Sequence, residues 1–345
     1  MNVTSYKIYK IACNGMLHFM PLRPSCAISI YISSSLLIAL IPPTAILNVI
    51  AFAVILKTKK LHTPPNVLLA STALCDFLSA IISMPFWALV WLFALHEKHY
   101  CSIYVAAVFA SHVLSYLSFL LVSFISIDRY LAIFKPFFYE EKIAPNPHYY
   151  ARSVIALTLL VTVINGLSLL TPNKKLIEIV ILLSLPPFIL QSVYIHLKVL
   201  QKVNEVRKMI SAFSIEQNGY SKKDKYMDAM ALETSEQSSC TKLNEDSKNN
   251  QRKIRRMEKQ VNIYHLTFIL LVSVVMCYMP YISITIMLRL MPQLRYEEWT
   301  NTTYMWSYFI TCIKSLANPL MYCFRSRMLR EQIRKTSRKF KNARK

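Results

Sequence analysis

The sequence predicts an all-α membrane protein, a seven-transmembrane helix bundle, and three observations support this. Hydrophobic residues make up 54% of the 345 residues, charged residues only 17%, and the chain holds 3 glycines. This is more apolar material than a water-soluble domain of this length usually carries. Seven apolar stretches, each near the roughly 20 residues that cross a bilayer core as a helix, alternate with polar breaks. The basic residues gather in alternate breaks.

The seven stretches set the domain organisation. The predicted spans are residues 29–56, 65–93, 103–134, 152–171, 176–203, 261–288 and 303–324. An N-terminal tail (1–28) precedes the bundle (29–324), which contains a long polar insert with a disordered centre (204–260), and a basic tail follows (325–345). The tail alternates residues such as Leu329 and Ile333 with basic ones, which predicts a short amphipathic helix on the membrane surface.

The net charge of +22 fits either a nucleic-acid binder or a membrane protein with a strongly oriented topology. Most of the 40 basic residues fall in segments that are internal if the N-terminus is outside, among them Lys57, Lys59 and Lys60. This segregation is the positive-inside rule. We therefore expect a multi-pass plasma-membrane protein with a cytoplasmic C-terminus and membrane lipids, not nucleic acid, as partners. Glycosylation sequons begin at Asn2 and Asn301, both on the predicted outer side.

Polar residues inside the spans are costly, so each is a candidate functional residue. In chain order they and the span prolines are Asn48, Asp76, Asp128-Arg129-Tyr130, Pro186, Tyr194, Pro280 and Asn318-Pro319-Leu320-Met321-Tyr322. This ordered set resembles the rhodopsin-like (class A) G-protein-coupled receptor family over about residues 29–340. The resemblance implies a receptor that binds an extracellular ligand in an outer cavity of the bundle and activates a heterotrimeric G protein.

The resemblance also implies a switch at the cytoplasmic end. In the family, the residue equivalent to Asp128 holds Arg129 at rest, and the arginine later meets the G protein with Tyr194 and Tyr322 as hydroxyl partners. Prolines kink helices, and the inner half of helix six is expected to move outward about Pro280. The predicted switch set is Asp128, Arg129, Tyr130, Tyr194, Asn318, Pro319, Tyr322, Pro280 and Tyr278. Taken alone, Arg129 also fits an arginine that snorkels to lipid headgroups.

The sequence departs from the family pattern near this switch. Tyr278 stands where most members have a tryptophan, two residues before Pro280. The acidic residue that locks the arginine from helix six has no match, because Glu258 is offset by about half a turn, so we expect a loose resting lock. Pro136 and Phe137 match the place where the family presents an apolar residue to its G protein.

The outer disulfide of the family is expected in an altered form. The loop over 171–175 contains no cysteine, which leaves Cys13, Cys26 and Cys101 as outward candidates. An odd set of three permits one bridge and one free thiol, and Cys26 with Cys101 is the pairing that we expect. The remaining span cysteines are interpreted as buried small hydrophobes: Cys75, Cys277, Cys312 and Cys323.

Lys314 lies at the middle of the seventh span, too deep to snorkel easily, on one stripe with Asn318 and Thr311. In related receptors, the positions equivalent to part of this polar network surround a sodium ion. The predicted network is Asn48, Asp76, Ser118, Lys314, Ser315 and Asn318. We expect Lys314 to pair with Asp76 as a tethered cation and to make the receptor insensitive to sodium. The alternative is a lysine that faces a separate water-filled cavity.

By analogy with the family, spans three, five, six and seven line the ligand cavity. The predicted walls are Ser111, His112, Ser115, Tyr116, Tyr278, Tyr281, Ile282, Thr285, Tyr304 and Tyr308. Aminergic receptors carry an aspartate at the position of Ser111, which disfavours a biogenic amine here. Small molecules, lipids and peptides stay open as ligand classes, and no cofactor or metal is expected.

Other function classes compete with a signalling receptor. A transporter would need charges along a path and often internal repeats, and an enzyme would need a metal, nucleophile or phosphate-binding motif; the sequence shows none of these. A receptor-like protein that no longer signals also fits the departures from the family pattern.

Acidic and hydroxyl side chains over 233–239 predict a phosphorylation code for arrestin, with a solvated linker as the alternative.

Overall fold

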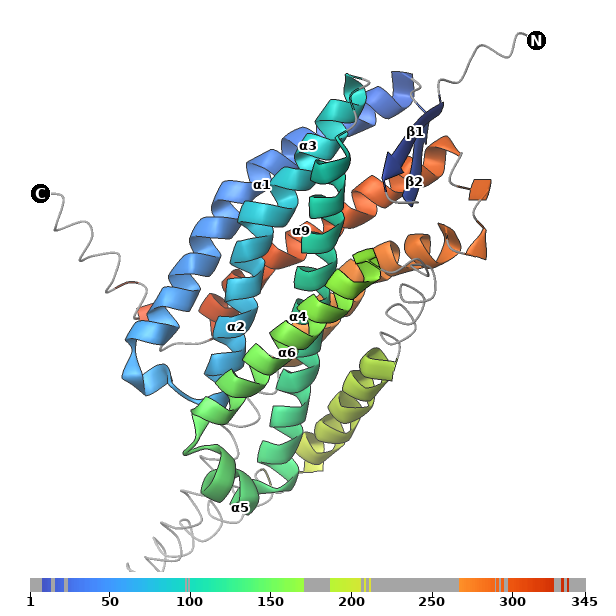
Figure 1. Cartoon of the computed structure of the whole chain (residues 1–345). Coiled ribbons are helices and arrows are strands. Elements are labelled where there is room, and N and C mark those ends of the chain that lie inside the picture. The colour runs from blue at the N-terminus through green and yellow to red at the C-terminus, as the bar shows by residue number, and fades with distance from the viewer. Residues whose placement is uncertain are drawn as a thin grey trace, which may run out of the picture.

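The computed structural model is a bundle of long helices. It describes residues 8–13, 16–21, 24–96, 98, 100–170, 187–205, 208, 211, 267–288, 290, 291, 293, 294, 297–325, 330, 331 and 334. Figure 1 shows the helices lying side by side with a common long direction. The insert and the basic tail fall almost entirely outside this range, as do Pro186 and Glu258, so the expectations for them stay predictions.

Within the described residues, seven helical segments make up the bundle, as predicted. They are α1 Pro24–Lys57, α2 Pro64–Leu78 with α3 Met84–Leu95, α4 Cys101–Phe134, α6 Pro147–Leu170, helices within 187–205 and 267–288, and α9 Glu298–Arg325. Short helical turns connect them: η1 Lys59–Leu61, α5 Pro136–Phe138 and η3 Tyr139–Ile143. Five segments of the described chain are long and apolar enough to cross a membrane: Ala27–Lys57, Pro64–Leu95, Cys101–Phe134, Pro147–Leu167 and Thr267–Leu288.

Prolines mark where several helices begin, and others lie inside helices. Pro64 and Pro136 occupy the first turns of α2 and α5, where a missing N–H costs nothing. Pro319 lies inside α9, where the proline removes a backbone hydrogen bond. Between α2 and α3 the chain continues through a π-helical turn, η2 Ser79–Ser83, so the two helices form one span.

The N-terminal region differs from the sequence prediction. The strands β1 Ile8–Cys13 and β2 Met16–Pro21 pair antiparallel, with Ile8 opposite Pro21 and Cys13 opposite Met16, and they pack against α4 and α9. The sequence contains a signal for this hairpin, because Asn14-Gly15 is a favoured two-residue turn. The prediction of a tail over 1–28 did not use this signal. The first helix begins at Pro24, earlier than the predicted 29, and α9 begins at Glu298, not 303.

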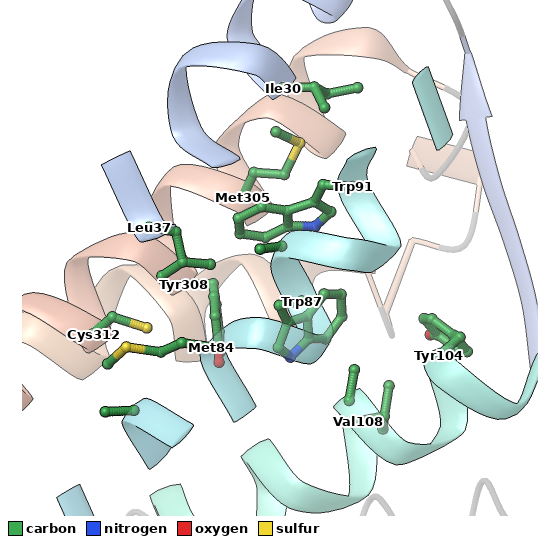
Figure 2. Packing of buried hydrophobic residues seen from close by; sticks show 13 residues of the cluster. Ile30, Leu37, Met84, Trp87, Trp91, Tyr104, Val108, Met305, Tyr308 and Cys312 are labelled. Carbon is green, nitrogen blue, oxygen red and sulfur yellow. The ribbon is translucent and has the colours of Figure 1, made fainter. Parts of the chain in front are cut away.

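Burial in the bundle suits a lipid environment. The outward stripe of α6 (Ile155, Leu159, Val163 and Leu167) is apolar and exposed, whereas polar residues such as Asn48 lie fully buried between helices. Costly polar groups therefore face the interior, as expected of a membrane bundle. One apolar cluster joins α1, α3, α4 and α9 in one half of the bundle, and Figure 2 shows Trp87 and Trp91 of α3 at its centre.

Candidate functional site

A charge pair lies at the centre of the bundle. The ammonium of Lys314 on α9 is 3.1 Å from Asp76 Oδ1 on α2, and the two side chains are 0% and 2% exposed. Neighbouring residues of α9 complete the shell of the carboxylate, because Ser315 donates to Oδ1 at 2.8 Å and Asn318 donates to Oδ2 at 2.6 Å. Lys314 also donates to Ser118 Oγ of α4 at 2.5 Å. Three helices thus meet at one buried charge pair.

Asn48 extends this network to α1. Its side-chain amide donates to the backbone oxygen of Ser315 at 2.9 Å and to that of Thr44 at 2.9 Å. The structure therefore brings together all six residues of the network that the sequence singled out. Every one of the six is buried.

Tyr278 connects the network to the helix that carries Pro280. The Lys314 ammonium lies 5.8 Å from the centroid of the Tyr278 ring, within the range of a cation–π interaction. The Tyr278 side chain also lies close to Ser115, one of the predicted cavity residues. The side chain at the toggle position therefore touches both the outer cavity region and the central charge pair.

A second charge pair lies at the inner end of α4. Arg129 donates through Nε to Asp128 Oδ2 at 2.8 Å, and its terminal nitrogen also contacts this oxygen and the Tyr139 hydroxyl. Tyr139 donates to Asp128 Oδ1 at 2.9 Å, and Tyr150 donates to the same oxygen at 2.8 Å. The Arg129 side chain is 2% exposed, so it is enclosed by protein and does not snorkel.

Sequence reasoning missed the two tyrosines of this cluster. Tyr139 comes from η3 in the second inner loop and Tyr150 from the start of α6, so neither lies in the motif around Arg129. Burial and the nearby Asp128 carboxylate raise the pKa of Tyr139 well above its usual value, which keeps its hydroxyl protonated and able to donate. Their spacing from Arg129 gave no signal, because only the folded loop brings them to Asp128.

The outer half of the bundle holds most of the predicted cavity residues on α4, the 267–288 helix and α9. Ser111 receives a hydrogen bond from Trp87 Nε1 at 3.1 Å and itself donates to the Ala107 carbonyl at 2.6 Å. The hydroxyls of Tyr281 and Tyr304 lie 3.1 Å apart. Partly buried residues accompany them: His112, Ser115, Tyr116, Ile282 and Thr285.

The outer half of the bundle also contains aromatic residues of span two, which were not among the predicted cavity residues. The Trp87 ring of α3 lies 5.3 Å from that of Tyr308 and 6.0 Å from that of Tyr304, centroid to centroid. Tyr308 is fixed by a 2.7 Å hydrogen bond to Ser83 (Figure 2 shows the ring beside Trp87). Trp91 and Tyr104 belong to the same cluster. Aromatic side chains of span two therefore pack against the predicted cavity residues Tyr304 and Tyr308.

The remaining predicted residues occupy varied positions. Tyr194 is 60% exposed, with the Lys198 ammonium 5.8 Å from its ring centroid, so it lies on the outer face of its helix. Cys101 forms a disulfide whose partner lies outside the described side chains, so its pairing with Cys26 stays a prediction. Cys75, Cys277 and Cys312 are free thiols, buried or half-buried. The Tyr322 side chain and Asn2 lie outside the described residues, and Asn301 lies in the first turns of α9.

Comparison with known proteins identifies the family of this architecture. Residues 47–322 match the family described as 7 transmembrane receptor (rhodopsin family). Trace amine-associated receptor 1 of Pan troglodytes is 36% identical over 114 residues, which cover 32% of this chain and 32% of the relative. Trace amine-associated receptor 6 of Homo sapiens is 35% identical over 100 residues, 28% of this chain and 27% of the relative. The matched segment spans less than a third of the length of these relatives. Since the family match covers most of the chain, the protein belongs to the rhodopsin family of seven-transmembrane receptors.

Proposed function

We propose that the protein is a G-protein-coupled receptor that binds an extracellular ligand in the outer half of the bundle and activates a heterotrimeric G protein through Arg129. The observation that carries this proposal is the enclosed Asp128–Arg129 pair with two tyrosine donors at the inner end of the bundle. A buried guanidinium is costly unless it is paired, so its position calls for a role. The role that fits is a latch, meaning an Asp128–Arg129 pair that separates when a partner protein binds.

The latch can open without unfolding any helix. Asp128 and Arg129 are neighbours on α4, so Arg129 can leave the carboxylate by side-chain rotation alone. The carboxylate would keep the donors Tyr139 and Tyr150 after Arg129 has left. The released arginine would then meet the G protein, with Tyr194 and Tyr322 as its hydroxyl partners once helix six has moved outward about Pro280.

An exposed apolar residue beside the latch supports a protein partner. Phe137 of α5 is 87% exposed, whereas the adjoining Tyr139 is buried against Asp128. Large exposed apolar side chains next to a charged cluster are typical of docking surfaces. We propose that Phe137 contacts the G protein while Tyr139 reports this contact to the latch.

The ligand that we propose is not a simple amine, although the curated relatives are named trace amine-associated receptors. An ammonium group in a membrane cavity needs a carboxylate or an equivalent partner. Of the described residues, the buried carboxylates are Asp76 and Asp128, and both are paired with a cation of the protein itself. Ser111 offers only a hydroxyl, and it is engaged with Trp87 and Ala107.

The membrane arrangement completes the proposal. The N-terminus lies outside, where Asn2 and Asn301 would accept glycans, and the basic C-terminal tail lies in the cytoplasm against anionic lipid. Phosphorylation of the hydroxyls over 233–239 would then create a charged segment for arrestin.

Basal G-protein activation tests the latch. Asp128→Asn weakens the hold on Arg129, so we expect higher ligand-independent nucleotide exchange than in the wild type at equal surface expression. Arg129→Ala removes the group that meets the G protein and should bring exchange down to the level of cells without receptor, even when combined with Asp128→Asn. Arg152→Ala removes an exposed arginine of the same membrane face and is the matched control. Equal exchange in all variants would refute signalling through Arg129 and favour a silent receptor-like protein.

A further inference from the structure

Lys314 places a full positive charge in the middle of the bundle with no access to solvent. Its side chain is 0% exposed, and its backbone lies on α9 between the turns of Thr311 and Asn318. Bare charges at this depth are costly, and the cost is recovered only when every donor is satisfied. The surroundings of the ammonium therefore decide what it does.

The three donor directions of the ammonium are all accounted for. One N–H donates to Asp76 Oδ1 and one to Ser118 Oγ, while the third side of the ammonium faces the Tyr278 ring. A lysine that served a separate water-filled cavity would direct at least one donor away from these groups. The contacts therefore favour the tethered pair that the sequence suggested.

The groups around the ammonium are also the groups that bind a small cation. Carboxylate and hydroxyl oxygens are hard ligands. Asp76 and Ser118 supply such oxygens within hydrogen-bonding distance of the Lys314 ammonium, and the Ser315 hydroxyl is bonded to the same carboxylate oxygen of Asp76. The ammonium of Lys314 lies where such a cation would bind, and its covalent attachment prevents it from diffusing away. A second cation this close to the ammonium would be strongly repelled.

We propose that Lys314 is a built-in cation that fills a latent monovalent-cation site formed by Asp76, Ser118 and Ser315, so that the resting bundle is held together independently of sodium. The covalent tether makes the occupancy of this site independent of ion concentration. Through the Tyr278 ring, the same charge restrains the helix that carries Pro280. The coupling between the centre of the bundle and this helix is therefore fixed by sequence and not by the salt of the medium.

Replacing the lysine should uncover the site. Asparagine at position 314 would remove the charge and offer an amide oxygen beside Asp76, Ser118 and Ser315. We therefore expect Lys314→Asn to gain a sodium response that the wild type lacks. The additional change Asp76→Asn removes the essential negative charge, so the double variant should lose the response again.

Thermal unfolding of the purified full chain in detergent micelles tests this. Tm is measured in sodium chloride and in N-methyl-D-glucamine chloride at equal ionic strength. We expect no difference for the wild type, a saturable rise of about 2–4 °C in sodium for Lys314→Asn, and no rise for Lys314→Asn/Asp76→Asn. Lys142→Asn changes an exposed lysine of η3 and should behave like the wild type.

Two results would overturn the proposal. A sodium-dependent rise of Tm in the wild type that Asp76→Asn abolishes would show that a mobile ion, not Lys314, occupies the site. A folded Lys314→Asn protein without a sodium response would show that no latent site exists. If Lys314→Asn does not fold, the comparison of the wild type with Asp76→Asn still decides the first point. None of these measurements needs a ligand or a G protein, so their failure is distinct from failure of the proposed receptor function.

Discussion

The two buried charge pairs of the bundle differ in how far apart their members lie in the chain. Asp128 and Arg129 are neighbours on one helix, whereas Asp76 and Lys314 are separated by 238 residues and join α2 to α9. Opening the first pair requires only rotation of side chains. Opening the second requires two helices to move apart or a charge to be left alone in an apolar interior, which is much more costly. The Asp128–Arg129 pair is therefore a latch, which can open by side-chain rotation. The Asp76–Lys314 pair is a clasp, which holds two helices together.

The supporting groups fit this division. Tyr139 and Tyr150, which hold Asp128, come from the second inner loop and the start of α6, so neither belongs to the helix that carries the pair. Ser315 and Asn318, which hold Asp76, lie on the same helix as Lys314, so they move with it. The Asp128–Arg129 pair is thus held by groups of other segments, whereas the groups that hold Asp76 belong to the same helix as Lys314.

Breaking the clasp should have the largest effect. Lys314→Met leaves the Asp76 carboxylate buried without its cation, which costs about 3–5 kcal/mol in comparable buried pairs. We expect Tm in sodium-free detergent solution to fall on the order of 10 °C. Lys314→Met/Asp76→Asn removes both charges and should recover most of the loss. If the double variant is as unstable as the single one, the lysine contributes by packing and the clasp is not electrostatic.

Weakening the latch should change signalling more than stability. Tyr139→Phe removes the hydroxyl that bonds to both members of the Asp128–Arg129 pair, and a hydrogen bond to a charged group contributes about 1.5–3 kcal/mol. We expect basal G-protein activation to rise about tenfold or more at equal surface expression, and Tyr150→Phe to have a similar but smaller effect. Tyr149→Phe alters the exposed neighbour of Tyr150 and serves as the control. Unchanged basal activity in Tyr139→Phe would mean that its hydroxyl does not hold the latch.

The fold and the clasp could be predicted from the sequence for one physical reason. Apolar segments of bilayer length must be helices, and a charge within such a segment must find a partner of opposite sign. Asp76 and Lys314 are opposite charges deep in two different spans, so their pairing could be expected from the sequence, with a separate water-filled cavity for Lys314 as the alternative. The order of apolar and polar segments was sufficient to predict the helix bundle, because in lipid only helices and closed barrels satisfy all backbone hydrogen bonds.

Other features depended on geometry that no spacing reveals. Tyr139 reaches Asp128 only because α5 and η3 fold the second inner loop back under α4. The expectation of a loose lock considered only the acidic partner on helix six and therefore missed these donors. Trp87 and Trp91 looked like ordinary apolar span residues, and their place opposite Tyr304 and Tyr308 follows from how α3 packs against α9.

The smallest effect that we predict concerns the outer half, where neither pair supplies a free carboxylate. Ser111→Asp would place one beside Trp87, inside the aromatic cluster, and a charge-assisted hydrogen bond to an ammonium would then become possible. We expect the variant to respond to 2-phenylethylamine at a concentration at least about tenfold below that of any response of the wild type, because the gain in pairing is partly offset by burial of the new charge. Ser102→Asp, at the exposed start of α4, controls for a change in surface charge. A wild type that responds as sensitively as Ser111→Asp would mean that the cavity recognises amines through its aromatic rings alone, which would contradict the proposed exclusion of amines.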